Sequence, residues 1–420
     1  MSQPTSEYSV LPGLRVRDHR IEVPLVHDDP ARGTIEVYAR EVAAPDGTDR
    51  PFLVFLQGGP GCEAPRPSGF PSSPPWLERA LADYCVLMLD QRGTGRSTPF
   101  GEADLTGDGA PDAAGLAEQL THYRADAIVA DAEAMREHLG VQRWSLLGQS
   151  FGGFTSLHYL STHADHLAEV YFTGGLPPVG RPVDEVYART YGHMARKSEL
   201  FYRRHPGARE RMVEVLAACE RGEVRLPNGD VVTPRWFRTL GHLLGGTGGS
   251  DHLAHLLEGD VRAPWFRHDL AGLLPFGGRN PLYAVVHESS YCDGGPTDWS
   301  AARTYPEAFA EDETLLTGEH LYPWHFEVSS ELAPFAQVAG CVAEVDWPRL
   351  YDADVLRSVN VPCAAAIYAD DVYVDREFSE QTAALLPNMR PWITNEYEHN
   401  GLRIGGGTIL DRLIRLAKDR

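Results

Sequence analysis

The chain has 420 residues, of which 43% are hydrophobic and 23% charged, and its formal net charge is −21. This composition is ordinary for a soluble globular protein with a large core. The acidic balance disfavours nucleic acid and anionic membranes as partners and favours cationic substrates. The length favours one large domain with a second one inserted or appended.

The six cysteines are scattered through the chain and form no CxxC pair. In a chain of this length they indicate reduced thiols rather than a disulfide framework. The N-terminal residues show no basic region followed by an apolar run, and no apolar stretch is long enough to cross a bilayer. We therefore expect a soluble cytoplasmic protein.

The N-terminal third reads as a succession of strands. The segment from Arg15 to Val42 alternates apolar and polar residues and predicts two or three antiparallel strands. Continuous apolar runs follow at Phe52–Leu56, Cys85–Leu89 and Trp144–Leu147. Runs of about five apolar residues are typical of strands covered on both faces, as in a parallel sheet.

Helices are predicted between and after these strands. Tyr123–Leu139 repeats apolar residues at helical spacing and is followed by Gly140 as a stop signal. A strand, helix, strand order of this kind gives a right-handed crossover. The C-terminal region repeats the pattern, with strands at Cys363–Tyr368 and Trp392–Thr394, a helix at Phe378–Leu386 and a final amphipathic helix at Ile409–Ala417.

The middle of the chain lacks this alternation. From about Pro177 to about Leu356 the sequence reads as mostly helical, with a glycine-rich break at Gly245–Gly249. We interpret residues 177–356 as an inserted cap. Residues 1–176 and 357–420 then form the two parts of one α/β core with a mostly parallel twisted sheet and helices on both faces.

Ser150 is the candidate nucleophile. It stands in Gly148-Gln-Ser-Phe-Gly152, a G-x-S-x-G pattern between a predicted strand and a predicted helix. In that setting the serine lies on a tight strained turn that lifts its hydroxyl above the sheet. The same turn points the N–H of Phe151 toward a developing oxyanion. In a chain with 41 glycines the bare pattern also arises by chance, so the strand and helix carry the interpretation.

The remaining catalytic candidates follow in the order Ser, acid, His, which is the order in proteins with such a turn. His399 follows the last predicted strand and is the candidate general base. Asp370 and Asp371 follow the strand at Cys363–Tyr368, and either is a candidate for the acid that orients the imidazole. The other one then reads as a turn or helix-capping residue.

Two glycine-rich loops precede the serine. Gly58-Gly-Pro-Gly61 follows a predicted strand and lets the backbone approach a substrate carbonyl, so the Gly59 N–H is the candidate second oxyanion donor. Asp90–Ser97 lacks the lysine and spacing of a phosphate-binding loop and is interpreted as a structural turn. The spacing of His and Cys residues fits no metal site, His252 and His255 read as helix-surface residues, and we expect neither a metal nor a cofactor.

Together the motifs Gln57-Gly-Gly-Pro-Gly61, Asp90-Gln-Arg-Gly-Thr-Gly-Arg-Ser97 and Gly148-Gln-Ser-Phe-Gly152 resemble those of the proline iminopeptidases, or prolyl aminopeptidases. Segments 368–375 and 395–402 are most similar to the large-cap members. The resemblance implies an α/β-hydrolase fold and an enzyme that releases N-terminal proline from peptides. It also implies a triad of Ser150, Asp371 and His399, with Gly59 and Phe151 as oxyanion donors. Gln57 departs from the histidine of most members, which affects local hydrogen bonding rather than the triad.

The family also places glutamates of its cap beside the substrate amine. By that resemblance Glu288 and Glu319 are candidates, with Glu327 in reserve, and peptides with a free N-terminal proline are the expected partners. Carboxylates suit this task because they pair with an ammonium group. Nearby aromatic residues either wall a proline pocket or belong to the cap core: Tyr291, Tyr322, Trp324 and Phe326.

Two other functions remain open at this point. An esterase or lactonase would use the same serine, acid and histidine without needing cap glutamates. A binding protein could keep the fold without catalysis, although an intact order of catalytic residues argues against it.

Overall fold

The computed structural model describes residues 7–107 and 109–418. Its centre is a nine-stranded sheet in the order β1-β2-β3-β7-β4-β8-β9-β10-β11. The first four strands in this order pair antiparallel, and all later pairs are parallel. The strands are β1 (Ser9–Leu11), β2 (Leu14–Pro24), β3 (Thr34–Ala43), β4 (Phe52–Leu56), β7 (Cys85–Leu89), β8 (Trp144–Gln149), β9 (Leu167–Thr173), β10 (Cys363–Tyr368) and β11 (Met389–Thr394). β5 (Ser68–Gly69) and β6 (Ser72–Ser73) form a separate small ribbon.

The predicted apolar runs are confirmed as buried strands. β4, β7 and β10 have the predicted bounds, and β8 continues two residues further, to Gln149. All residues of β7, β8 and β10 are buried, as expected for strands covered on both faces. β9 was not predicted, because Glu169 interrupts its apolar run.

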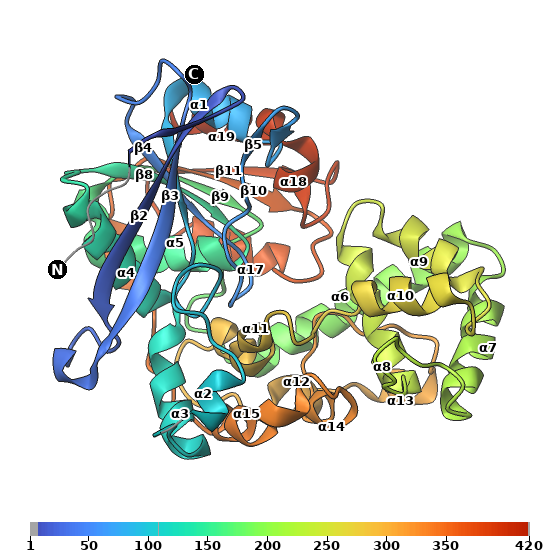
Figure 1. The fold of residues 1–420 in the computed structure, drawn as a ribbon. Coiled ribbons are helices and arrows are strands. Elements are labelled where there is room, and N and C mark those ends of the chain that lie inside the picture. The colour runs from blue at the N-terminus through green and yellow to red at the C-terminus, as the bar shows by residue number, and fades with distance from the viewer. Residues whose placement is uncertain (1–6, 108, 419–420) are drawn as a thin grey trace.

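Helices cover both faces of this sheet (Figure 1). Side chains alternate along β4, so that Leu53 and Phe55 pack with α1 and α19 while Val54 and Leu56 pack with α4 and α5. The helices of this part are α1 (Leu77–Asp83), α4 (Ala125–His138), α5 (Phe151–His163), α17 (Arg376–Ala383), α18 (Gly401–Gly405) and α19 (Gly407–Ala417). The mostly parallel sheet with helices on both faces confirms the predicted α/β architecture.

Between β9 and β10 the chain is helical. Its helices are α6 (Val183–Arg204), α7 (Ala208–Glu220), α8 (Pro234–Arg238), α9 (Gly249–Leu257), α10 (Pro264–Leu273), α11 (Pro281–Val286), α12 (Ser300–Arg303), α13 (Glu307–Glu311), α14 (His325–Val328), α15 (Ala336–Ala343) and α16 (Ala353–Ser358). In Figure 1 the helices α7, α9 and α10 form a lobe beside the sheet, and α11, α12, α14 and α15 lie below it. We call this helical region the cap.

A segment of the N-terminal part also packs against the cap. α2 (Ala103–Thr106) and α3 (Ala113–Leu120) follow β7, and α3 packs against α15. Leu116 and Leu120 share an apolar cluster with Val338 and Val342 of α15. The lower half of the cap is therefore anchored by residues that precede the elbow serine in sequence.

The carboxyl ends of the parallel strands meet at one edge of the sheet, and the predicted site residues follow them there. β4 leads into the loop at Gly58–Gly61, β8 into Ser150, and β10 and β11 into the loops of Asp371 and His399. Within residues 7–107 and 109–418, no helix is long and apolar enough to cross a membrane.

Candidate active site

Ser150 occupies the sharp turn between β8 and α5. Its backbone has φ 55° and ψ −126°, a conformation that residues other than glycine rarely adopt. The turn is held by hydrogen bonds from Ser150 N to Thr173 O, at 3.0 Å, and from Gly153 N to Ser150 O, at 2.7 Å. This is the geometry of a nucleophile elbow, which presents the serine hydroxyl at the start of a helix.

The glycines of the elbow are required by close backbone contacts. A Cβ on Gly152 would lie 1.9 Å from the carbonyl oxygen of Leu56, and one on Gly148 would lie 2.6 Å from that of Gly152. Neither backbone oxygen can move without disturbing β4 or α5. The spacing of the G-x-S-x-G pattern is therefore a consequence of how tightly α5 packs on the sheet.

His399 and Asp371 form a hydrogen-bonded pair. Their Nδ1 and Oδ2 atoms are 2.7 Å apart. Asp371 is buried, and its other oxygen accepts hydrogen bonds from the backbone N–H groups of Tyr373 and Val374, at 2.8 and 3.1 Å. These bonds fix the carboxylate, which in turn fixes the imidazole ring so that its second nitrogen is free for proton transfer. Asp370 is exposed and does not take part in this pair.

The loop after β4 lies directly beside Ser150. A Cβ built on Gly58 would be 3.5 Å from the serine Oγ. Gly59 follows with φ 123°, a value that favours glycine. Among the described residues, no protein acceptor pairs with the N–H of Gly59 or of Phe151 at the start of α5. Both groups therefore remain available to an oxyanion at Ser150.

Two buried side chains hold the neighbouring loops in place. Asp90 accepts hydrogen bonds from the N–H groups of Ala64 and Arg96, and Arg92 binds Asp131 through Nε at 2.7 Å. Burial raises the pKa of Asp90. Gln57 accepts a hydrogen bond from Gly58 N at 3.0 Å, so it orders the loop that carries Gly59. These contacts fit the interpretation of Asp90–Ser97 as a structural turn.

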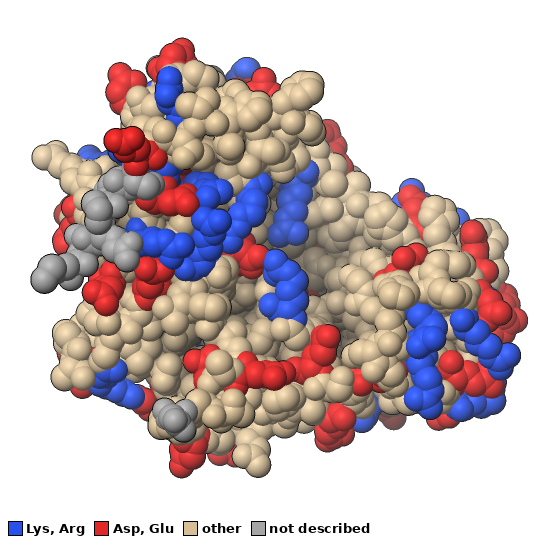
Figure 2. All heavy atoms as spheres, in the orientation of Figure 1, with Lys and Arg blue, Asp and Glu red and all other residues tan. Residues whose placement is uncertain are grey.

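Ser150 and His399 line one cavity of about 560 Å³ between the sheet edge and the cap. In Figure 2 the surface is hollowed where the sheet-bearing part meets the lobe of α9 and α10. The cap side of the cavity includes His242, Gly249 and His252. A cavity of this size takes a small peptide or an ester of similar size.

Glu319 is the predicted cap glutamate that the structure brings into this cavity. Burial and, to a smaller extent, the negative charge of Asp371 raise the pKa of its carboxyl to about 8, although Arg403 opposes the shift. Its carboxylate makes no hydrogen bond or ion pair with any other described residue. A half-buried carboxyl without a partner, facing an open cavity, is suited to bind a cationic group.

The structure places the other two glutamates elsewhere. The Glu288 oxygens accept hydrogen bonds from Ser300 N and Ala301 N, at 3.0 and 2.9 Å, and so cap α12. Burial raises the pKa of Glu288 to about 7, although these two bonds oppose the shift. Glu327 is 69% exposed and lies 3.5 Å from Arg235. Neither residue lines the Ser150 cavity.

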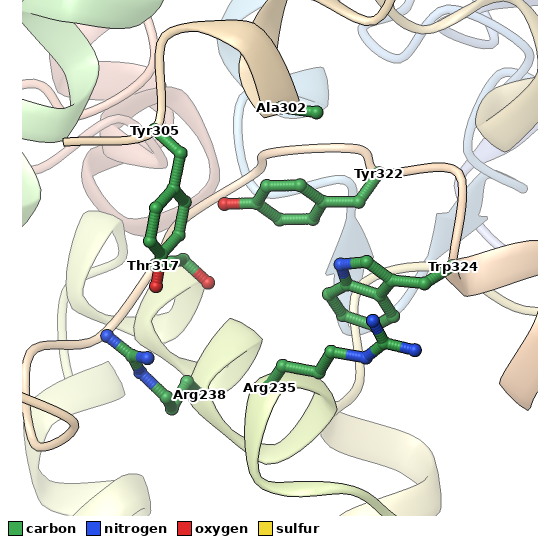
Figure 3. Close-up of a pocket in the computed structure, with 7 residues that line it drawn as sticks. All are labelled: Arg235, Arg238, Ala302, Tyr305, Thr317, Tyr322 and Trp324. Carbon is green, nitrogen blue, oxygen red and sulfur yellow. The ribbon is translucent and has the colours of Figure 1, made fainter. Parts of the chain in front are cut away.

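The predicted aromatic residues also lie outside this cavity. Tyr322 and Trp324 line a separate cap pocket of about 340 Å³, where the ring of Trp324 stacks against Arg235 (Figure 3). Tyr291 and Phe326 are buried in apolar clusters. The aromatic walls of the Ser150 cavity are instead Tyr283 and Tyr373.

Several cavity residues were not predicted. Arg403 binds Gln149 at 3.1 Å and lies in α18, four residues after His399, and Asn400 directly follows that histidine. Tyr373 packs its ring 4.7 Å from that of His399. Their closeness in sequence to Asp371 and His399 could have indicated that they lie in the cavity. Over residues 7–107 and 109–418 no cluster of ligating side chains could hold a metal ion.

Known proteins resemble this chain over its whole length. It is 44% identical to a proline iminopeptidase of Aeromonas sobria, over 100% of both chains, and 31% identical to one of Aspergillus aculeatus, over 97% of this chain and 94% of the other. A family model described as the alpha/beta hydrolase fold matches residues 51–206. A serine hydrolase structure from Cycloclasticus zankles superposes with a TM-score of 0.44 at 14% identity, covering 96% of this chain and 98% of the other. The full-length identity shows that this chain belongs to the proline iminopeptidase family of α/β hydrolases.

Proposed function

We propose that this protein is a serine aminopeptidase that releases proline from the N-terminus of peptides. The observation that carries the proposal is one cavity lined by Ser150, His399 and the unpartnered carboxyl of Glu319, with Asp371 hydrogen-bonded to His399. The serine and histidine supply acyl transfer, and the glutamate supplies recognition of a free amine. The names of the full-length relatives support the same activity.

Glu319 selects a free N-terminus in this proposal. A protonated N-terminal amine that enters the cavity offers the carboxylate the partner that the protein does not provide. An N-acylated peptide carries no positive charge there and would leave the carboxyl unpaired. Tyr283 and Tyr373 supply flat apolar surfaces for the pyrrolidine ring.

Catalysis then proceeds in two acyl-transfer steps. His399 takes the proton of Ser150 while Oγ attacks the proline carbonyl, and the N–H groups of Gly59 and Phe151 stabilise the oxyanion. The imidazolium protonates the leaving amine, so that the shortened peptide departs and prolyl-serine remains. Water, deprotonated by His399, attacks this ester, and proline is released as Ser150 recovers its proton.

The alternative is an esterase or lactonase on the same triad. Hydrolysis of proline 2-naphthylamide, its N-acetyl derivative and a proline aryl ester distinguishes the two. A peptidase of the proposed kind hydrolyses the free amide and ester, rejects the acetylated amide and loses activity on Ser150→Ala substitution. Efficient hydrolysis of simple acyl esters with no turnover of the free proline amide would overturn the proposal.

We also propose a cytoplasmic location, and peptides rather than nucleic acid or membranes as the partners. All six cysteines are free, which fits a reducing compartment. Fractionation of the native host with a cytoplasmic marker enzyme tests the location.

A further inference from the structure

A groove of about 490 Å³ lies on the cap between α9 and α10. The two helices lie side by side in the lobe beside the sheet (Figure 1). α9 contributes His252, His255 and Leu256, which share one face of a helix because they are three and four residues apart. α10 contributes the facing set Trp265, His268, Asp269, Gly272 and Leu273, with the same spacing.

The groove adjoins the Ser150 cavity. His252 lines both, and Gly249, one turn earlier on the same face of α9, lines the cavity. A second link is the hydrogen bond between His242 Nε2, in the cavity, and Leu273 O, in the groove, at 2.7 Å. The face of α9 therefore runs from the catalytic cavity into the groove without a change of element.

Leu256 and Leu273 of the groove pack into the cap core, but its tryptophan and histidine side chains do not. Trp265 is 49% exposed, whereas most large apolar side chains of the cap are buried. Among the described residues, the imidazoles of His252, His255 and His268 have no hydrogen-bond or ionic partner. An exposed tryptophan beside unpartnered hydrogen-bonding rings is a typical surface for binding a peptide.

We propose that this groove binds the downstream residues of the peptide substrate and gives the enzyme a preference for longer peptides with an aromatic or large apolar side chain there. This inference rests on the proposed function. The occupant is the substrate itself, because a bound peptide that extends from Ser150 toward α9 enters this groove next. The imidazoles bind peptide N–H and C=O groups, and Trp265 packs against the side chain.

The helix sets the length of peptide that reaches Trp265. From Gly249 to Leu256 α9 rises about 10 Å. An extended peptide covers that distance with about three residues. With the residues on either side of the cleaved bond held in the cavity, a peptide of about five residues or more reaches the groove, and a dipeptide does not.

The test uses glycine peptides of two to seven residues that begin with proline and carry one phenylalanine at successive positions. Proline release is measured for the wild type, for Trp265→Ala and for the matched control Val213→Ala. Val213 is an apolar residue of α7 that is 53% exposed and lies outside the groove. Proline 2-naphthylamide, which is too short to reach the groove, reports the basal activity of each variant.

For the wild type we expect kcat/KM to rise about tenfold when phenylalanine stands at about the fifth position, as for an aromatic contact that becomes buried. Trp265→Ala should lose this increase and keep its activity on the naphthylamide, and Val213→Ala should keep both. The inference is overturned if kcat/KM does not depend on peptide length, or if Trp265→Ala lowers both activities equally. A wild type that hydrolyses no proline substrate at all refutes the proposed function instead, and this inference with it.

Discussion

Glu319→Gln offers the sharpest test of amine recognition, because the expected effect depends on pH. The substitution keeps the shape of the side chain and removes its charge. The pKa of the Glu319 carboxyl is raised to about 8. At pH 6 the carboxyl must lose its proton before it can pair with an ammonium group, at a cost of about 3 kcal/mol. At pH 8 that cost falls below about 1 kcal/mol.

The pair of the Glu319 carboxylate and the substrate ammonium group contributes about 1.5–3 kcal/mol to binding, the range for hydrogen bonds to charged groups. At pH 6 the cost of ionising the carboxyl offsets most of this contribution, so the variant and the wild type should bind the peptide with similar affinity. At pH 8 the variant should bind roughly tenfold to hundredfold more weakly. An N-terminal amine with a pKa of about 8 remains at least half protonated over this range.

The assay is calorimetric binding of a peptide with N-terminal proline to Ser150→Ala and to Ser150→Ala with Glu319→Gln, between pH 6 and 8. The serine substitution separates binding from catalysis by His399. Glu327→Gln, an exposed residue beside Arg235, is the matched control and should change nothing. A ratio of dissociation constants that stays the same from pH 6 to 8 would refute the reasoning.

Three further substitutions test the site and its scaffold. Asp371→Asn should lower kcat by about 10⁴ because the imidazole loses its orienting carboxylate, whereas Asp370→Asn should leave kcat unchanged; an equal loss in both would contradict the pairing with His399. Gly152→Ala places a methyl group 1.9 Å from Leu56 O and should abolish soluble folded protein or reduce kcat more than hundredfold. The control Gly192→Ala, whose nearest neighbour is 3.8 Å away, should keep the wild-type circular dichroism spectrum and activity. Glu288→Gln should lower the free energy of unfolding by about 1–2 kcal/mol in urea, because α12 loses one of its caps, and unchanged stability would exclude that capping role.

Local patterns were enough to predict much of the core. β4, β7 and β10 are short apolar runs bounded by turn residues, and a buried parallel strand needs little else. The elbow could be predicted because the G-x-S-x-G pattern stands between a strand and a helix that are both recognisable from nearby residues. β9 escaped prediction because Glu169, at its exposed end, hides the apolar run that enters the sheet.

The sequence alone determined the strands, the elbow and the order in which serine, acid and histidine arise, because each depends on residues close to it in the chain. The tertiary structure decided between Asp370 and Asp371 as the partner of His399 and separated Glu319 from Glu288. Each of these choices depends on which distant part of the chain a side chain meets. A glutamate beside the N-terminus of α12 caps that helix, whereas one at the cavity wall stays without a protein partner, and no spacing in the sequence distinguishes the two.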